Sequence, residues 1–379
     1  MDGEKRVYSG KEVIKAGEYL VNRSTLEDPA QFNSAMDILS FWRLKHEAPL
    51  ESAFTLLQQT VSKYDKTAIF AKRLKRYPSI VSKLHRFNKM KLKNMQDIGG
   101  CRTIVSSKKK LDQVVRELKK RPEFKRKTGK LRYKDYLGKP KNDGYRGYHL
   151  IGTFLDQDDN KKNIELQIRT KLQHDWATAV EIVDLFTGQA LKSNKGITEW
   201  KQFFLFVSEH FAEMDDIHLF RSKIAQDQSK IYKSKLDKSL LASAVQVQNY
   251  TAQLDVIKNL DAFANTLKIV DDHISEKSIN GYILLKVDTE KHEVTTTLFE
   301  NKNISDAEKQ YVEMEKSAAE LKNITVALIS TTAVGGIKEA YPNYFADSSE
   351  FLKYLFLINS ITKSKENNPF LKMLKKSGL

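Results

Sequence analysis

The segment 163–170, NIELQIRT, constrains the fold more than any other part of this sequence. Its apolar and polar residues alternate, with Ile164, Leu166 and Ile168 set against Glu165, Gln167 and Arg169. Successive side chains of a β-strand point to opposite faces, so the segment predicts a strand with one apolar and one polar face. That polar face can line a site, or it can face solvent at the edge of a sheet. The segment alone leaves both interpretations open.

The segments before this strand predict a mixture of helices and strands. Helical spacing of apolar residues indicates a helix at 29–48, and Pro49 starts a second helix that runs to about Tyr64. A short basic helix (79–89), a strand (97–107), an amphipathic helix (111–121) and a strand (148–155) follow. Such an order predicts the α+β class, with a mixed sheet flanked by helices.

After residue 170 the pattern returns to helices through roughly Asn265. The pattern then indicates a hairpin (281–289 and 292–299), a helix (306–322), a strand (324–331) and a closing helix (348–358), which together predict a smaller C-terminal α+β domain. We therefore divide the chain into a helical lead-in (1–60), a core (61–180), a helical extension (181–255) and a C-terminal domain (256–379). The role of the last domain is open between a regulatory contact, a homo-oligomer contact and passive structure.

The positive charge of the chain is concentrated in one segment. The formal net charge is +16, and residues 61–140 hold 26 Lys or Arg against 6 Asp or Glu. A segment of this kind suits an anionic partner such as a nucleoside polyphosphate or RNA. For scattered cations such as Lys108 to Lys110, solvated helix faces explain the charge equally simply.

Neither export nor membrane insertion is indicated. The sequence contains no run of about 18 apolar residues, and its first ten residues lack the apolar centre of a signal peptide. Cys101 is the single cysteine, so an internal disulfide is excluded and a buried apolar role is the simplest interpretation. We expect a cytoplasmic protein without a membrane partner.

Phosphate binding would have to rely on side chains, because neither GxxxxGK[ST] nor GxGxxG occurs. The stretch 72–86 holds a cluster of cations around Ser79, which we expect to cap the following helix: Lys72, Arg73, Lys75, Arg76 and Lys83. Cations and free amide groups at a helix start can converge on a triphosphate. The same stretch would also suit an RNA-contacting surface.

A second cationic stretch, 134–149, interleaves lysines with tyrosines and glycines. It contains Lys134, Lys139, Lys141 and Arg146, together with Tyr136, Tyr145 and Tyr148. A base can stack on an exposed tyrosine while cations hold its phosphates. A solvent loop anchored by buried tyrosines would show the same composition.

Two carboxylates stand out against this basic background. Asp97 lies at the entry to one predicted strand and Glu165 in the middle of another. If neighbouring strands bring them together, they form a hard oxygen site suited to Mg²⁺ and a triphosphate. Ordinary ion pairing with Arg102 or Arg169 is the alternative.

Four segments, in this order, resemble the synthetase domain of the RelA/SpoT alarmone enzymes. They are RLKRYPSIVSKL (73–84), DIGGCRTIV (97–105), YKDYLGKPKNDGYRGYH (133–149) and IELQIRTKLQHDWA (164–177). The resemblance implies a nucleotidyltransferase-like fold and an Mg²⁺-dependent reaction. In that reaction the β,γ-pyrophosphate of ATP moves to the 3′-hydroxyl of GDP or GTP, and AMP is released.

The resemblance also implies a role for individual residues. Arg73, Lys75, Lys83 and Arg102 would bind ATP, and Asp97 would hold the metal. Glu165 would be a second metal ligand or the general base. Tyr145 would stack on the acceptor guanine. Lys134, Lys139, His149, Gln167 and Arg169 would surround the acceptor. His174 is interpreted as structural.

The match departs from the family at Asp143 and Gly147, where asparagine and serine are usual, which leaves the acceptor open. A toxin-like enzyme that pyrophosphorylates tRNA 3′ ends or adenine nucleotides is one alternative. A non-catalytic RNA- or nucleotide-binding regulator is another, although the presence of both Asp97 and Glu165 argues against it.

Overall fold

The computed structural model describes residues 7–22, 28–187, 191, 196–217, 230–260, 281–288, 291, 293–318, 321, 324–330 and 348–361. The segment YPNYFAD (341–347), which the sequence leaves open between a surface loop and a buried turn, lies outside the described residues. No described helix is both long and apolar enough to cross a membrane.

Three helices open the chain: α1 (Gly10–Asn22), α2 (Pro29–Leu44) and α3 (Glu47–Val61). The side chain of Asp28 accepts a hydrogen bond from the backbone of Gln31, and Pro29 occupies the first turn, so α2 begins where a cap and a proline favour it. The two predicted helices at 29–48 and 49–64 correspond to α2 and α3. Helix α1 was not predicted.

A five-stranded sheet forms the centre of the molecule, in the order β1-β2-β5-β4-β3. Its strands are β1 (Ile69–Leu74), β2 (Gly99–Val105), β5 (Lys161–Thr170), β4 (Tyr148–Leu155) and β3 (Tyr133–Asp135). Strands β2 and β5 run parallel and the other neighbours run antiparallel. The predicted mixed sheet is confirmed. Because β5 lies between β2 and β4, the edge-strand interpretation of 163–170 is wrong.

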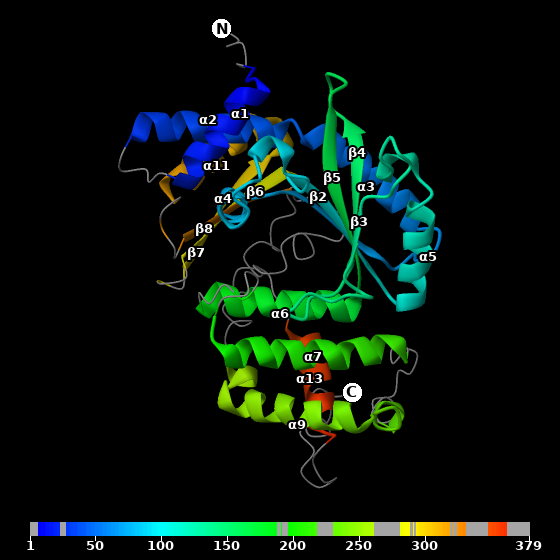
Figure 1. Cartoon of the computed structure of the whole chain (residues 1–379). Coiled ribbons are helices and arrows are strands. Elements are labelled where there is room, and N and C mark those ends of the chain that lie inside the picture. The colour runs from blue at the N-terminus through cyan, green and yellow to red at the C-terminus, as the bar shows by residue number, and fades with distance from the viewer. Residues whose placement is uncertain are drawn as a thin grey trace.

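One face of this sheet is the apolar core. Helices α3 and α5 (Lys108–Leu118) cover it (Figure 1), and Ser107 caps α5 by accepting from the backbone of Lys110. Ile164, Leu166 and Ile168 of β5 are fully buried against these helices. Cys101 lies in the same cluster, as predicted. The opposite face of the sheet therefore carries the polar side chains.

Helix α4 (Tyr77–Arg86) follows β1 and packs on the N-terminal helices through Ile80 and Leu84. Short 3₁₀ turns occur at η1 (Leu92–Asn94) and η2 (Pro122–Phe124). Ser79 does not cap α4. The helix starts earlier, at Tyr77, because Pro78 suits its first turn, and the capping position falls to Arg76, whose side chain makes no capping hydrogen bond.

A layer of helices lies below the sheet (Figure 1). It contains α6 (Lys171–Thr187), α7 (Thr198–Asp216), α9 (Lys238–Gln253) and α13 (Ser349–Asn359), which share one hydrophobic cluster. Residues 348–358, expected to close the C-terminal α+β domain, thus pack in the helical layer instead.

A second sheet has the order β7-β6-β8 and is antiparallel throughout. Its strands are β6 (Gly281–Asp288), β7 (Glu293–Glu300) and β8 (Ile324–Ser330). Between β7 and β8 the chain forms η5 (Asn301–Asn303) and α11 (Ile304–Ser317). Helix α11 packs on this sheet and also on α2. The predicted smaller C-terminal α+β unit is confirmed, while the domain boundaries stay a prediction.

Candidate active site on the polar face of the sheet

The register of the strands brings the predicted residues into adjacent rows. In one row Arg73 of β1 lies opposite Gly100 of β2, which lies opposite Glu165 of β5. The next row lies two residues further along β2 and β5. From β2 across to β3, it contains Arg102, Gln167, His149 and Lys134. Residues in register on neighbouring strands share a face. Segments far apart in the sequence therefore meet on the polar face.

Asp97 lies two residues before β2 and binds two lysines. Its Oδ2 accepts from Lys75 Nζ at 3.0 Å, and its Oδ1 lies 2.7 Å from Lys83 Nζ. Burial disfavours the charge on Asp97, but the two ammonium groups outweigh it and lower the pKa of the carboxyl. Asp97 thus takes part in ion pairs, as the alternative interpretation expected, with Lys75 and Lys83 as its partners. Asp97 is ionised and placed between the two lysines expected to bind ATP.

Glu165 is the first member of a hydrogen-bonded chain along the polar face. Its Oε1 lies 3.1 Å from His149 Nδ1, and its Oε2 accepts from Gln167 Nε2 at 2.8 Å. His149 Nε2 is 2.6 Å from the hydroxyl of Tyr145. Arg169 donates to that hydroxyl from Nε at 3.1 Å and from an NH2 group at 2.8 Å. Gln167 also accepts from Arg169.

The direction of these hydrogen bonds follows from the fixed donors. Because Arg169 can only donate, its two bonds occupy the lone pairs of the Tyr145 oxygen, and the hydroxyl proton points to His149 Nε2. His149 then carries its proton on Nδ1 and donates it to Glu165. Burial lowers the pKa of His149 more than the neighbouring Glu165 raises it, which agrees with a neutral imidazole.

Glu165 is held as a carboxylate. Its burial opposes ionisation, yet His149 and Gln167 lower its pKa far below the usual range. A carboxylate with such a low pKa is a weak proton acceptor. It remains a good acceptor of hydrogen bonds and a hard ligand for a cation.

Three guanidinium groups converge beside these carboxylates. Burial and the nearby charges of Arg169 and Arg73 lower the pKa of Arg102, since like charges disfavour one another. A cavity of the polar face is lined by Arg73, Lys75, Asp97, Gly100, Arg102 and Glu165, among others. An anion with several charges would relieve the repulsion among the guanidinium groups.

The residues present offer the type of ligand atom that a magnesium ion prefers, namely carboxylate oxygens. Both Asp97 and Glu165 line this one cavity, and both are ionised. Among the described residues, no group of three or more His, Cys, Asp or Glu is placed to hold a metal. Mg²⁺ is commonly held by one or two carboxylates, with substrate phosphates and water completing its six ligands. The two carboxylates would hold it only together with a bound triphosphate.

Tyr145 does not present a free ring for stacking. Lys141 Nζ lies 4.5 Å from the ring centroid and the Arg169 guanidinium carbon lies 5.0 Å from it. Tyr136 and Trp176 contact the ring edge-on. A guanine base could stack on Tyr145 only after Lys141 moves aside. Tyr136 and Lys141 were not assigned to the site from the sequence, although their interleaving with Tyr145 was the available signal.

The other predicted residues lie at the margin. Lys134 and Lys139 are exposed, so their contact with an acceptor stays a prediction. His174, interpreted as structural, lies near Arg102 and Arg169, whose charges lower its pKa together with burial. It therefore adjoins the guanidinium cluster.

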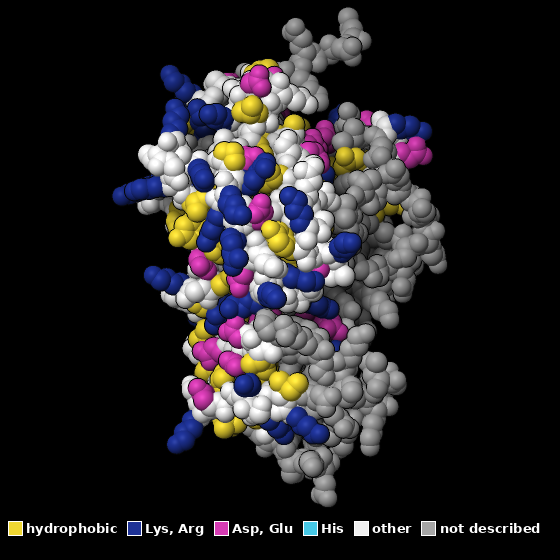
Figure 2. Space-filling view, turned by 90° about the vertical axis from the view of Figure 1, so that its right-hand side faces the viewer, with side chains coloured by type: hydrophobic (Ala, Val, Ile, Leu, Met, Phe, Trp, Pro, Cys, Tyr) yellow, Lys and Arg dark blue, Asp and Glu magenta, His cyan; other side chains and the backbone are white. Residues whose placement is uncertain are grey.

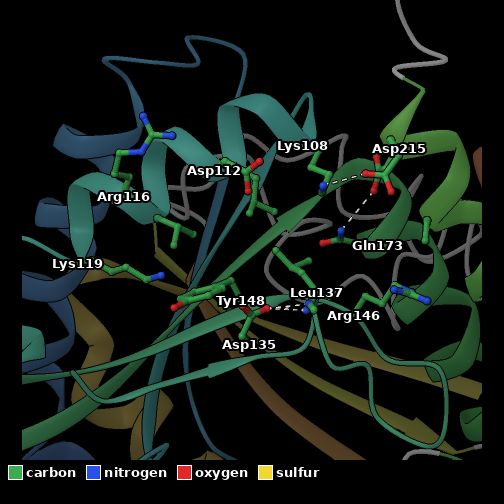
Figure 3. Close-up of a pocket in the computed structure, with 15 residues that line it drawn as sticks. Lys108, Asp112, Arg116, Lys119, Asp135, Leu137, Arg146, Tyr148, Gln173 and Asp215 are labelled. Atoms are coloured by element: carbon green, nitrogen blue, oxygen red, sulfur yellow. Dashed lines mark hydrogen bonds and ion pairs between the residues drawn. The ribbon is translucent and has the colours of Figure 1, made fainter. Parts of the chain in front are cut away.

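A second cavity lies on the core side of the sheet, between α5, α6, α7 and the loop after β3 (Figure 3). Cations and carboxylates alternate around it, and Lys108 pairs with Asp216 at 2.9 Å. Asp215 is 3% exposed and accepts from Thr170 and Gln173. Its burial raises its pKa to about 7. Arg146 and Tyr148 of the second cationic stretch line this cavity, whereas the residues to which the resemblance assigns a role do not.

The Lys and Arg side chains form no single patch on the face that Figure 2 shows. They are scattered there, with Asp and Glu between them. Lys108 pairs with Asp216, and Lys110 pairs with Asp65 at 3.0 Å. These cations are thus satisfied by ion pairs within the protein. The cations that converge are those of the polar face.

Comparison with known proteins agrees with the sequence motifs. Residues 72–182 match the family model described as the region found in RelA/SpoT proteins, which confirms the predicted resemblance. No match was found among curated proteins.

Solved structures similar to this chain include small alarmone synthetase 1 from Bacillus subtilis bound to pppGpp, with 22% identity and a TM-score of 0.41, covering 48% of this chain and 96% of that one. Small alarmone synthetase 2 from Bacillus subtilis has 24% identity and a TM-score of 0.39, with 48% and 95% covered. A GTP pyrophosphokinase family protein from Streptococcus pneumoniae has 22% identity and a TM-score of 0.38, with 49% and 92% covered.

Proposed function

We propose that the RelA/SpoT region at residues 72–182 transfers pyrophosphate from ATP to the 3′-hydroxyl of a guanine nucleotide. The observation that carries the proposal is the cavity in which two ionised carboxylates, Asp97 and Glu165, lie among Arg73, Lys75 and Arg102. A transfer of this kind depends on positioning and charge neutralisation more than on a covalent nucleophile.

The reaction exchanges one phosphorus–oxygen bond for another, and the acceptor gives up its hydroxyl proton to the leaving phosphate or to water. The acceptor 3′-oxygen bonds to the β-phosphorus of ATP, the bond from that phosphorus to the oxygen bridging the α-phosphate breaks, and AMP leaves with the bridging oxygen. A magnesium ion bound with ATP would neutralise charge on the triphosphate.

Lys75 and Lys83 exchange partners when ATP binds. Both are paired with Asp97 here. In the loaded site Asp97 would hold the metal, and the two ammonium groups would bind the phosphate oxygens. Arg73 and Arg102 hold the transferred group, because their guanidinium groups can each form paired hydrogen bonds to phosphate.

Glu165 orients the acceptor. Its lowered pKa suits it to accept a hydrogen bond from the 3′-hydroxyl, and less to take the proton early. A loose transition state needs little help from a base. His149, Tyr145 and Arg169 fix the carboxylate in place, and the guanine enters beside Tyr145 when Lys141 moves off its ring.

The test is to incubate the purified full chain with Mg²⁺ and ATP carrying a label in the β-phosphate. GDP, GTP, ATP and deacylated tRNA are supplied as separate acceptors. We expect AMP release in step with labelling of GDP or GTP. Labelling of tRNA or ATP alone would replace the guanine nucleotide as acceptor. Absence of AMP with every acceptor, while ATP still binds, would support the non-catalytic alternative.

A further inference from the structure

Helix α4 is capped by a residue from the C-terminal sheet unit. The side chain of Arg76, at its capping position, makes no capping hydrogen bond. Instead, the backbone N–H of Tyr77 donates to Oε1 of Glu315, on α11, at 3.0 Å. A carboxylate at a helix N-terminus satisfies an unpaired amide and interacts favourably with the helix dipole. The two residues are 238 positions apart.

The carboxylate of Glu315 is itself held by a buried network. Its Oε2 accepts from Arg43 of α2 at 2.8 Å, and its Oε1 accepts from the hydroxyl of Tyr311 at 2.6 Å. Tyr311 in turn accepts from Arg43 at 2.8 Å. Glu315 is 3% exposed and Arg43 is 6% exposed. Since a buried ion pair tolerates little displacement, the carboxylate is fixed against the first turn of α4.

Two cations of the candidate active site flank this turn. Lys75 precedes Tyr77 by two residues, and Lys83 lies in the following turns of α4. Both bind Asp97, and the backbone of Lys75 donates to the carbonyl of Ile98 beside it. A shift or fraying of the start of α4 would move both ammonium groups relative to Asp97.

We propose that Glu315 is a positioning residue for ATP binding: from the C-terminal sheet unit it fixes α4, and through α4 it places Lys75 and Lys83. This inference rests on the proposed function, because it assigns the two lysines to the triphosphate. In this inference α11, and with it the C-terminal sheet unit, supports the geometry of the nucleotide site.

The decisive variant is Glu315→Asp in the full chain. The shorter side chain keeps its charge beside Arg43 but draws back from the backbone of Tyr77. Two variants on the same helix serve as controls. Tyr311→Phe removes the hydroxyl from the network but leaves the ion pair with Arg43 to hold the carboxylate on α4. Lys316→Ala removes an exposed ion pair with Asp37, 2.7 Å long, at the same contact between α11 and α2.

Three quantities are measured for each variant: binding of a non-hydrolysable ATP analogue, the KM values for ATP and acceptor, and hydrogen exchange of the amides in 77–86. For Glu315→Asp we expect analogue affinity to fall about tenfold, as loss of a helix cap predicts, with faster exchange at the start of α4. The KM for ATP should rise by a similar factor while the acceptor KM stays within twofold. Both controls should stay within about twofold for all three.

The inference would be overturned if Glu315→Asp and Tyr311→Phe lost analogue affinity equally and their melting temperatures fell equally. Such a result would reflect general destabilisation. Unchanged ATP affinity in Glu315→Asp would overturn it as well. Wild-type protein that binds the analogue but releases no AMP would contradict the proposed function alone. Wild-type protein that does not bind the analogue would contradict both.

Discussion

Gly100 lies directly opposite Glu165 in the parallel pair of β2 and β5. A Cβ added to Gly100 would meet only the backbone oxygen of Glu165, at 3.5 Å, which is an ordinary contact. The strand can therefore accept a side chain here. The glycine instead leaves the space beside the carboxylate open, between Glu165 and Arg73.

We expect Gly100→Val to fold and to lose ATP binding, because its methyl groups would occupy the cavity beside Glu165. Analogue affinity should fall about tenfold or more, with the melting temperature nearly unchanged. Gly99→Ala is the contrasting variant. Its Cβ would lie 2.7 Å from Ile164 in the core, so it should cost about 1–3 kcal/mol of folding stability. Strong destabilisation by Gly100→Val would refute the idea that this position is open.

Removal of either carboxylate charge should abolish transfer. Glu165→Gln and Asp97→Asn keep the shape of the side chain and remove the ligand charge. We expect AMP release to fall about a hundredfold or more, with circular dichroism unchanged. Asp158→Asn, which alters an exposed ion pair with Lys45, is the matched control and should retain full activity. Near-normal turnover in either active-site variant would defeat the assignment.

Substitutions of Tyr145 separate stacking from hydrogen bonding. Tyr145→Phe keeps the ring but loses the bonds to His149 and Arg169. It should lower kcat with little change in the acceptor KM, since Glu165 loses its support. Tyr145→Ala should in addition raise the acceptor KM far more than the KM for ATP. If Tyr145→Ala raised both KM values equally, the stacking role would be contradicted.

Asp215 should make folding stability depend on pH. Burial raises its folded pKa to about 7, above the ordinary value of 3.8. The folded state therefore binds this proton more tightly than the unfolded state does. The stabilisation that proton binding by Asp215 gives to the folded state is fully present below about pH 4. It is lost as the pH rises to about 7, a change of up to roughly 4 kcal/mol.

The variant that checks this is Asp215→Asn, followed by urea unfolding between pH 5 and 8. The decline of stability with pH should flatten, because the amide oxygen can still accept from Thr170 and Gln173 without a charge. Asp216→Asn removes an exposed neighbouring charge that also raises the pKa of Asp215, so it should reduce the slope much less than Asp215→Asn does. An unchanged slope in Asp215→Asn would show that another group causes the decline.

The sequence was sufficient to predict strands β2, β4 and β5, and it singled out the two carboxylates that the structure places in one cavity. Alternation in β5 is strong because that strand separates a core from a polar site, and its neighbours carry similar signals. Strand β1 was missed, since Lys72 and Arg73 made its residues look like part of a basic cluster rather than a strand. Lys75 and Lys83 were singled out as cations from the sequence, but their pairing with Asp97 depends on how the strands and α4 pack, which a single segment cannot reveal.

Contacts between distant segments could not be predicted. Nothing in the segment around Glu315 distinguishes its carboxylate from those of a solvated helix face, and its partners Arg43 and Tyr77 belong to the first quarter of the chain. The crowding of Tyr145 by Lys141 likewise depends on how the loop folds back on itself. Local patterns identify chemical groups, whereas tertiary packing decides which of them meet.

Helix α13 returns to the helical layer after the C-terminal sheet, and it covers aromatic side chains there. Phe351 lies 5.6 Å from Phe211 and 6.5 Å from Phe203, ring centre to ring centre. A shortened chain that stopped before residue 349 would expose these rings to water and tend to aggregate. A change of activity after deletion of the C-terminal region would therefore not distinguish a lost regulatory contact from a lost folding partner. Point substitutions that leave α13 in place would distinguish the two.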